Sequence, residues 1–140
     1  MNREVYNTFN TIKMKKINEN TASAYLERHY GEIKDEIHTL SSHKNFPGIL
    51  QAIINLLRFL QEKGQICKVG LRIKIIGRLY NKGNDYLKYI IENLFIRSFV
   101  GIKKRCTTQE WNVLYKQIPE NLKKIYIQQN QEQSQKKLSI

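Results

Sequence analysis

Residues 83–100 read GNDYLKYIIENLFIRSFV, and their apolar side chains do not keep to one face of a helix. They are spread around most of the circumference: Leu87, Ile90, Ile91 and Leu94 on one side, with Tyr86, Tyr89, Phe95, Ile96, Phe99 and Val100 around the rest. A helix that is apolar nearly all round is covered by neighbours on several sides. Asn84 can cap it, and Asp85 adds negative charge at the positive end of its dipole. We therefore predict a central helix at about 84–100.

Other helices are predicted on both sides of this segment from apolar residues at spacings of three and four. They cover about 20–40, with Gly31 a candidate break, then 47–64 and 65–81, a short helix with a capping box formed by Thr107 and Glu110, and a last helix opened by Pro119. The sequence thus predicts a single all-α domain, a compact bundle of five or six helices around the central one.

Two glycines stand out within the predicted 65–81 helix. Gly70 and Gly77 lie seven residues apart along one edge of it. Glycine inside a helix costs ~1 kcal/mol relative to alanine. The pair therefore predicts that another backbone comes close at this edge.

Both ends of the chain differ from the middle in composition. Residues 1–19 are polar and basic without a clear period and predict a weakly ordered basic arm, in which Met14 is an alternative start to Met1. From Gln128 the sequence becomes QQNQEQSQKK, a low-complexity stretch. We predict a helical domain over 20–129 and a polar frayed or disordered tail over 130–140.

Charge is the clearest deviation from an average composition. The chain has 140 residues and a net charge of +12, which favours an acidic protein, nucleic acid or an anionic membrane surface as partner. The first residues lack the apolar region of a signal peptide, and no apolar run reaches the ~18 residues that a membrane span needs. We expect a cytoplasmic protein without a membrane segment.

Residues for catalysis or metal binding do not form a pattern. Cys67 and Cys106 each stand alone, which indicates reduced, half-buried thiols and no zinc site. His29 lies in an apolar stripe and is predicted to be a core histidine, whereas His38 would point to the opposite face. No Ser/His/Asp, Cys/His or glycine-rich phosphate motif is present. We expect no enzyme activity, no metal and no cofactor.

A row of basic residues on the 65–81 helix is the best candidate binding site. Lys74, Arg78 and Lys82 are spaced by four, and Lys68 with Arg72 form a second pair on the flank. No acidic residue interrupts the segment. The row fits phosphate contacts, which position a nucleic acid without reading its sequence. The alternative is a solvated face whose side-chain stems pack on apolar neighbours.

Polar residues inside the apolar central helix form a second candidate. Asn93 and Arg97 share a face, and Glu92 points elsewhere. Buried polar groups need partners, so these residues either line a pocket or bond to nearby backbone. The basic run at 103–105 would extend the basic face only if the fold brings it near.

The second half of the chain resembles a family of small uncharacterised bacterial helical proteins. Some other families of this size and type accompany toxin genes as immunity proteins, so the resemblance suggests a toxin-neutralising role by analogy. The resemblance covers 71–129. It rests on three motifs. The first is a helix that ends in Leu-Tyr-x-x-Gly-Asn, at Leu79, Tyr80, Gly83 and Asn84; the second is Ile-Glu-Asn-x-Phe, at Ile91, Glu92, Asn93 and Phe95. The third is Pro-x-x-Leu near a tyrosine, at Pro119, Leu122 and Tyr126. The resemblance implies an all-helical domain and carries no functional residues.

Two functions from different classes follow from these observations. The first is a non-catalytic cytoplasmic interaction protein that binds a protein partner, as an immunity or accessory protein does. At +12 the expected partner is acidic, which disfavours immunity to a basic nuclease because such inhibitors are acidic. The alternative is a non-specific nucleic-acid-binding module that uses the basic helix face. The oligomeric state, including a homodimer, stays open.

Overall fold

The computed structural model describes residues 16–138, with side chains to residue 136. The helices in chain order are α2 (Glu19–His29), η1 (Gly31–Ile33), α3 (Lys34–Ser42), α4 (Phe46–Glu62), α5 (Ile66–Lys82), α6 (Asp85–Ile90), η2 (Ile91–Phe95), η3 (Ile96–Ser98), α7 (Phe99–Arg105), α8 (Thr108–Gln117) and α9 (Glu120–Leu138). The predicted all-α fold is confirmed, since this part of the chain contains no strand and only one isolated bridge, between Ile17 and Gly83.

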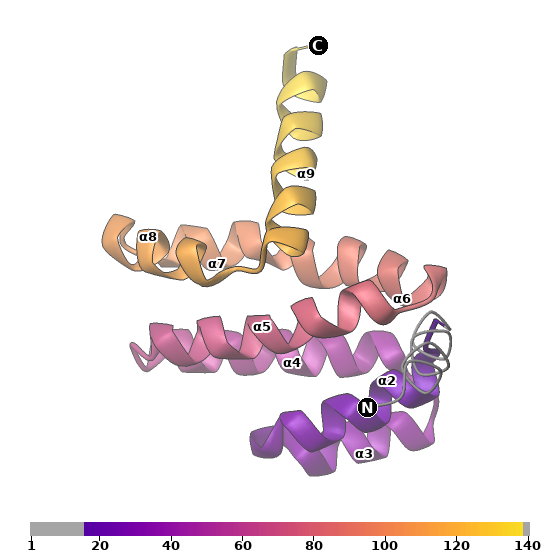
Figure 1. Cartoon of the computed structure of the whole chain (residues 1–140). Coiled ribbons are helices and arrows are strands. Elements are labelled where there is room, and N and C mark those ends of the chain that lie inside the picture. Colours follow the sequence, from indigo (N-terminus) through magenta and orange to yellow (C-terminus); the bar gives the residue numbers. More distant parts are fainter. Residues whose placement is uncertain (1–15, 139–140) are drawn as a thin grey trace, which may run out of the picture.

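The helices are stacked in layers (Figure 1). The α2–α3 pair lies below α4 and α5, the helices from α6 to α8 lie above them, and α9 rises away from the upper layer. The middle layer is the most apolar, and α4 carries ten buried residues among its 17. None of the described helices is both long enough and apolar enough to cross a membrane.

The predicted central helix is one continuous rod that runs from α6 through η2 and η3 to α7, residues 85–105. Its middle turn, η2, is wound as a π-helix. Leu87, Ile91 and Phe95 are fully buried, as predicted, and Ile90 and Leu94 are half-buried. Three apolar side chains are instead exposed: Tyr86 at 45%, Tyr89 at 63% and Val100 at 43%. The rod is therefore covered on its inner side and open on its outer side.

Capping side chains fix where the helices begin. Asn84 Oδ1 accepts the Leu87 N–H at 2.9 Å, which confirms the predicted cap of the rod. The capping box is also present: the Glu110 N–H donates to Thr107 Oγ1 at 3.1 Å, and the Thr107 N–H donates to Glu110 Oε1 at 2.9 Å. The first predicted helix is broken after His29, as its glycine suggested.

The structure describes only the end of the predicted amino-terminal arm, but most of the predicted carboxyl-terminal tail. Most of the predicted arm, residues 1–15, lies outside the described residues. At its end, the Ile17 N–H donates to the Lys82 carbonyl at 2.9 Å and the Asn84 N–H donates to the Ile17 carbonyl at 3.0 Å. At the other end, α9 is helical to Leu138, where composition predicted a frayed or disordered tail. Glutamine, glutamate and lysine are good helix formers, and they extend a helix already started at Glu120.

Aromatic rings fix the first half of α9 to the rod and to α8. The Tyr126 ring centroid lies 5.9 Å from that of Phe99 and 5.9 Å from that of Trp111. Tyr126 and Leu122 are buried. Residues 131–136 are exposed, so α9 leaves the body of the protein after this anchor.

The two glycines of α5 receive side chains from the elbow between α8 and α9, not the backbone that we predicted. A Cβ atom at Gly77 would lie 2.5 Å from Pro119 Cγ, and one at Gly70 would lie 1.5 Å from Gln117 Oε1. The proline ring is rigid, whereas the glutamine amide is the far end of a flexible side chain. Gly77 is therefore the position that allows the elbow to pack on α5.

These contacts predict opposite tolerance at the two glycines. Gly77→Ala should lower the free energy of unfolding by about 1–2 kcal/mol, because the clash with Pro119 exceeds the gain in helix propensity. Gly70→Ala should change it by less than about 0.5 kcal/mol, since Gln117 can move. Urea unfolding of both variants measures this, and equal effects at the two sites would contradict it.

A polar joint connects η1 to the middle of α5. The buried Tyr30 hydroxyl donates to the Arg72 carbonyl at 2.5 Å, and Arg72 Nε donates to Glu32 Oε2 at 2.8 Å. Partial burial raises the pKa of Glu32, but the hydrogen bonds and charge of Arg72 outweigh it and lower that pKa below its usual value. The joint holds the lower layer to α5.

Because this pKa is lowered in the folded state, the stabilisation by Glu32 is present above its unfolded pKa of about 4.3 and is lost as the pH falls through the lower folded value. Glu32→Gln should remove this part of the acid dependence. Thermal unfolding between pH 6 and 2 should therefore give a shallower loss of stability in the variant than in the parent. If stability falls with pH equally in the variant and the parent, the ion pair of Glu32 with Arg72 does not contribute to the acid dependence.

Candidate functional site

The five predicted basic residues of α5 do not form one surface. Arg72 is paired with Glu32, and Lys68 is near enough to lower the pKa of the same carboxyl. These two residues face the acidic lower layer. Lys74 and Arg78 instead line a cleft on the other side of α5, and Lys82 is exposed at the end of the helix without lining it.

This cleft, which we call the elbow cleft, lies between α5 and the junction of α8 with α9. It has a volume of about 490 Å³ and is lined by Lys74, Gly77, Arg78, Asn81, Gln117, Pro119 and Asn121. Asn121 is held in place on both sides of its amide: Nδ2 donates to the Gly77 carbonyl at 2.9 Å, and Oδ1 accepts the Leu122 N–H at 2.9 Å.

Positive charge in the elbow cleft is not neutralised by any residue that lines it. Within the described part of the chain, neither Lys74 nor Arg78 makes an ion pair. Glu120, which lies between Pro119 and Asn121 in the sequence, points its carboxylate to Lys123 Nζ at 3.3 Å. Lys16 Nζ lies 3.5 Å from the Asn81 carbonyl and adds a third cation beside the cleft. The amino end of α9 contributes further positive potential.

Amide groups complete the lining. The buried Gln117 Oε1 has no hydrogen-bond partner among the described residues, but it is an acceptor, so only the amide N–H groups can donate to an anion. Two cations with neighbouring amides suit a carboxylate or another anionic group. Apart from the Lys74 amine, none of the side chains that line the cleft is of a type that commonly acts as a nucleophile or general base.

Lys74 and Arg78 could be predicted from the sequence as binding residues, but the residues on the opposite wall of the elbow cleft could not. Gln117, Pro119 and Asn121 come from more than 35 residues further along the chain than Lys74 and Arg78. The one signal that pointed to them was the glycine pair in α5, because those glycines make room for the elbow.

The polar residues of the rod are structural for the most part. Glu92 accepts the Tyr80 hydroxyl at 2.7 Å, while its backbone carbonyl accepts Gln129 Nε2 at 2.9 Å. Burial and the bond to Glu92 raise the pKa of Tyr80. Asn93 Nδ2 donates to the Tyr89 carbonyl at 2.9 Å. Arg97 is exposed and lines a different cleft, on the side of the rod that faces α9.

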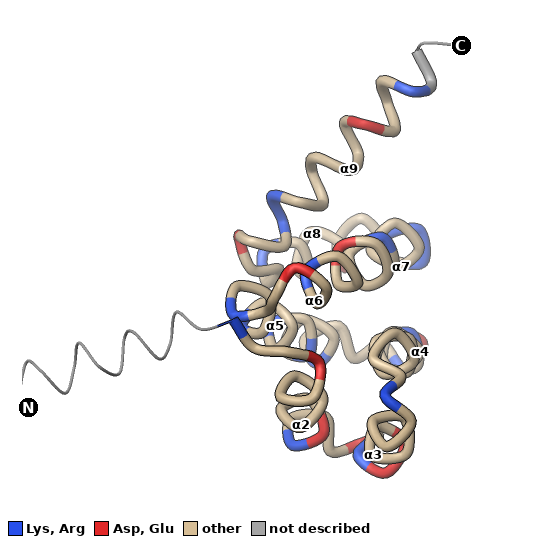
Figure 2. The backbone as a smooth tube through the Cα atoms, turned by 90° about the vertical axis from the view of Figure 1, so that its right-hand side faces the viewer, with Lys and Arg blue, Asp and Glu red and all other residues tan. Residues whose placement is uncertain are grey.

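The basic run Lys103, Lys104 and Arg105 does not extend the elbow cleft. These residues form the last turn of α7, just before the amino end of α8, whereas the cleft is at the carboxyl end of α8. Ten residues of helix separate those ends by about 15 Å. In Figure 2 the basic end of α7 lies at the far side of the upper layer from the turn between α5 and α6.

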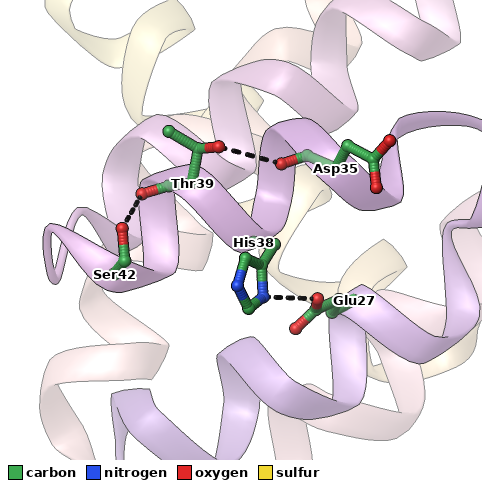
Figure 3. A network of polar contacts seen from close by, with 5 residues as sticks. All are labelled: Glu27, Asp35, His38, Thr39 and Ser42. Carbon is green, nitrogen blue, oxygen red and sulfur yellow. Dashed lines mark hydrogen bonds and ion pairs between the residues drawn. The ribbon is translucent and has the colours of Figure 1, made fainter.

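Histidine contacts are confined to α2 and α3 (Figure 3). His38 Nδ1 lies 2.8 Å from Glu27 Oε1 and joins the two helices. The hydroxyls of Thr39 and Ser42 donate to backbone carbonyls of their own helix, at 3.1 and 2.6 Å. The prediction of a core histidine at His29 is wrong, because the adjacent Tyr30 takes the buried position. The exposed His29 ring packs on Tyr25 at an interplanar angle of 44°.

The one close serine–histidine pair is not arranged for catalysis. His43 Nδ1 lies 3.2 Å from Ser42 Oγ and 3.2 Å from the Thr39 carbonyl. A carbonyl only accepts, so Nδ1 is the donor there and cannot take a proton from the serine. Cys67 is exposed, not half-buried as predicted, whereas Cys106 is half-buried and accepts Gln61 Nε2 at 3.2 Å. Between residues 16 and 136, no three ligating side chains are grouped to hold a metal ion.

Comparison with known proteins gives one match. No curated protein and no solved structure matches the chain. A family model matches residues 23–134, a range that begins within α2 and ends within α9. The link to toxin immunity stays a prediction. The chain thus belongs to the family described as Domain of unknown function (DUF7674).

Proposed function

We propose that this chain is a non-catalytic binding protein that takes an acidic protein partner at the elbow cleft. One observation carries the proposal: Lys74 and Arg78 stand together in a cleft that contains no acidic side chain. Lys74 is half-buried and Arg78 is exposed, so both can contact an external anion, and the net charge of +12 attracts acidic molecules over longer distances.

The shape of the cleft favours a protein over a nucleic acid at this site. A phosphate backbone is best followed by a continuous row of cations. In α5 that row is divided, since Arg72 is occupied by Glu32 and Lys68 lies on the same side as Arg72. A cleft of about 490 Å³ with two cations and the fixed amide of Asn121 suits one or two acidic side chains.

From the sequence resemblance we further propose that the chain is an immunity or accessory protein. An immunity or accessory protein of the bacterial cytoplasm binds one dedicated partner and performs no chemistry. The support for this setting is the sequence resemblance over residues 71–129.

A photo-crosslinking residue in place of the exposed Asn81 tests this function in cells of the source organism. We expect adducts with an acidic protein. In the same background, Lys74→Glu with Arg78→Glu should reduce the adducts by at least about tenfold, because buried charge pairs at interfaces contribute strongly.

The matched control is Lys34→Glu with Lys44→Glu, which changes the net charge equally on exposed residues near α3. It should leave the adducts unchanged. Adducts with nucleic acid, or equal loss in both double variants, would show that the elbow cleft is not the binding site of an acidic protein.

A further inference from the structure

The outer side of the rod carries a second surface, independent of the elbow cleft. Its exposed residues recur every three or four positions along residues 85–105: Tyr86, Tyr89, Asn93, Arg97, Val100 and Lys104. They therefore lie along one face of the rod. Most large apolar side chains of this protein are buried, so two exposed tyrosines one turn apart need an explanation.

Helix α9 builds a wall beside this face. As it rises from the upper layer (Figure 1), it encloses a cleft of about 610 Å³ against the rod. We call it the rod cleft. Arg97, Val100 and Lys104 line it from α7 and the turn before it, and the amide and hydroxyl side chains of Asn130, Gln133 and Ser134 line it from α9. The wall is rigid at its base because Gln129 donates to the Glu92 carbonyl.

The charge of the rod cleft is positive. No acidic residue lines it, and among the described residues neither Arg97 nor Lys104 makes an ion pair. The rod contains two acids: Glu92 turns to Tyr80 on another side, and Asp85 lies in the first turn, far from the cleft. The cations and the tyrosines thus share one face, about 22 Å long from Tyr89 to Lys104 at 1.5 Å per residue.

We propose that the outer face of the rod and the rod cleft bind single-stranded nucleic acid. Exposed aromatic rings stack on unpaired bases, arginine and lysine contact phosphates, and asparagine and glutamine amides bond to base edges. An acidic peptide would use the two cations, but it would leave the tyrosines without a role. A duplex keeps its bases stacked on each other and would contact the cations alone.

Binding of a short fluorescein-labelled oligouridylate to the full chain, followed by fluorescence anisotropy, tests this inference. Tyr89→Ala should weaken binding by about tenfold, the effect of removing the platform for one stacked base, and Tyr89→Phe should retain it. Arg97→Gln with Lys104→Gln should reduce the salt slope by about 1.4, which is 0.7 for each phosphate that is no longer neutralised.

Lys74→Gln with Arg78→Gln is the matched control, because it removes the same charge from the elbow cleft. It should leave both affinity and salt slope near those of the parent. A failure of the proposed protein partner at the elbow cleft would not affect this result. The inference is overturned if the parent does not bind at low salt, if both double variants lose binding equally, or if unlabelled polyglutamate competes as well as unlabelled oligouridylate.

Discussion

The structure depends on covering most of the circumference of one helix, α4, of which only the face with Gln51, Asn55, Phe59 and Glu62 stays exposed. Its apolar residues are too many for one face, and side chains as far around the helix as Leu50, Ile53 and Leu56 are all buried. Burying such side chains contributes roughly 1.5–3 kcal/mol each. The lower layer, α5 and the inner side of the rod each supply part of the cover. Only the inner side of the rod is needed to cover α4, so its outer side can face solvent and contact a partner.

Both candidate binding surfaces follow from how the upper layer is attached. Gly77 admits the Pro119 ring, and the ring fixes the elbow at which α8 gives way to α9. Tyr126 then anchors the first half of α9 against Trp111 and Phe99, so the second half extends outward. One side of this elbow forms the cleft with Lys74 and Arg78, and the far side of α9 forms the cleft with Arg97 and Lys104. Neither cleft exists in a single helix.

Local features of the fold could be predicted from the sequence, and features that depend on distant partners could not. Helical periodicity, the cap at Asn84 and the break at Gly31 are properties of neighbouring residues. Periodicity does not show which tyrosines of the rod face outward, because burial is decided by α4 and α9. The pairing of Arg72 with Glu32, 40 residues away, likewise divided a basic row that the sequence presents as one.

The inner and outer sides of the rod can be compared directly by two substitutions. Phe95 is fully buried, whereas Tyr89 is 63% exposed. If the rod covers α4 as described, Phe95→Ala should lower the free energy of unfolding by about 3–5 kcal/mol. Tyr89→Ala should change it by less than about 0.5 kcal/mol. Equal losses in chemical denaturation, or a larger loss at Tyr89, would contradict this orientation of the rod and the surfaces inferred from it.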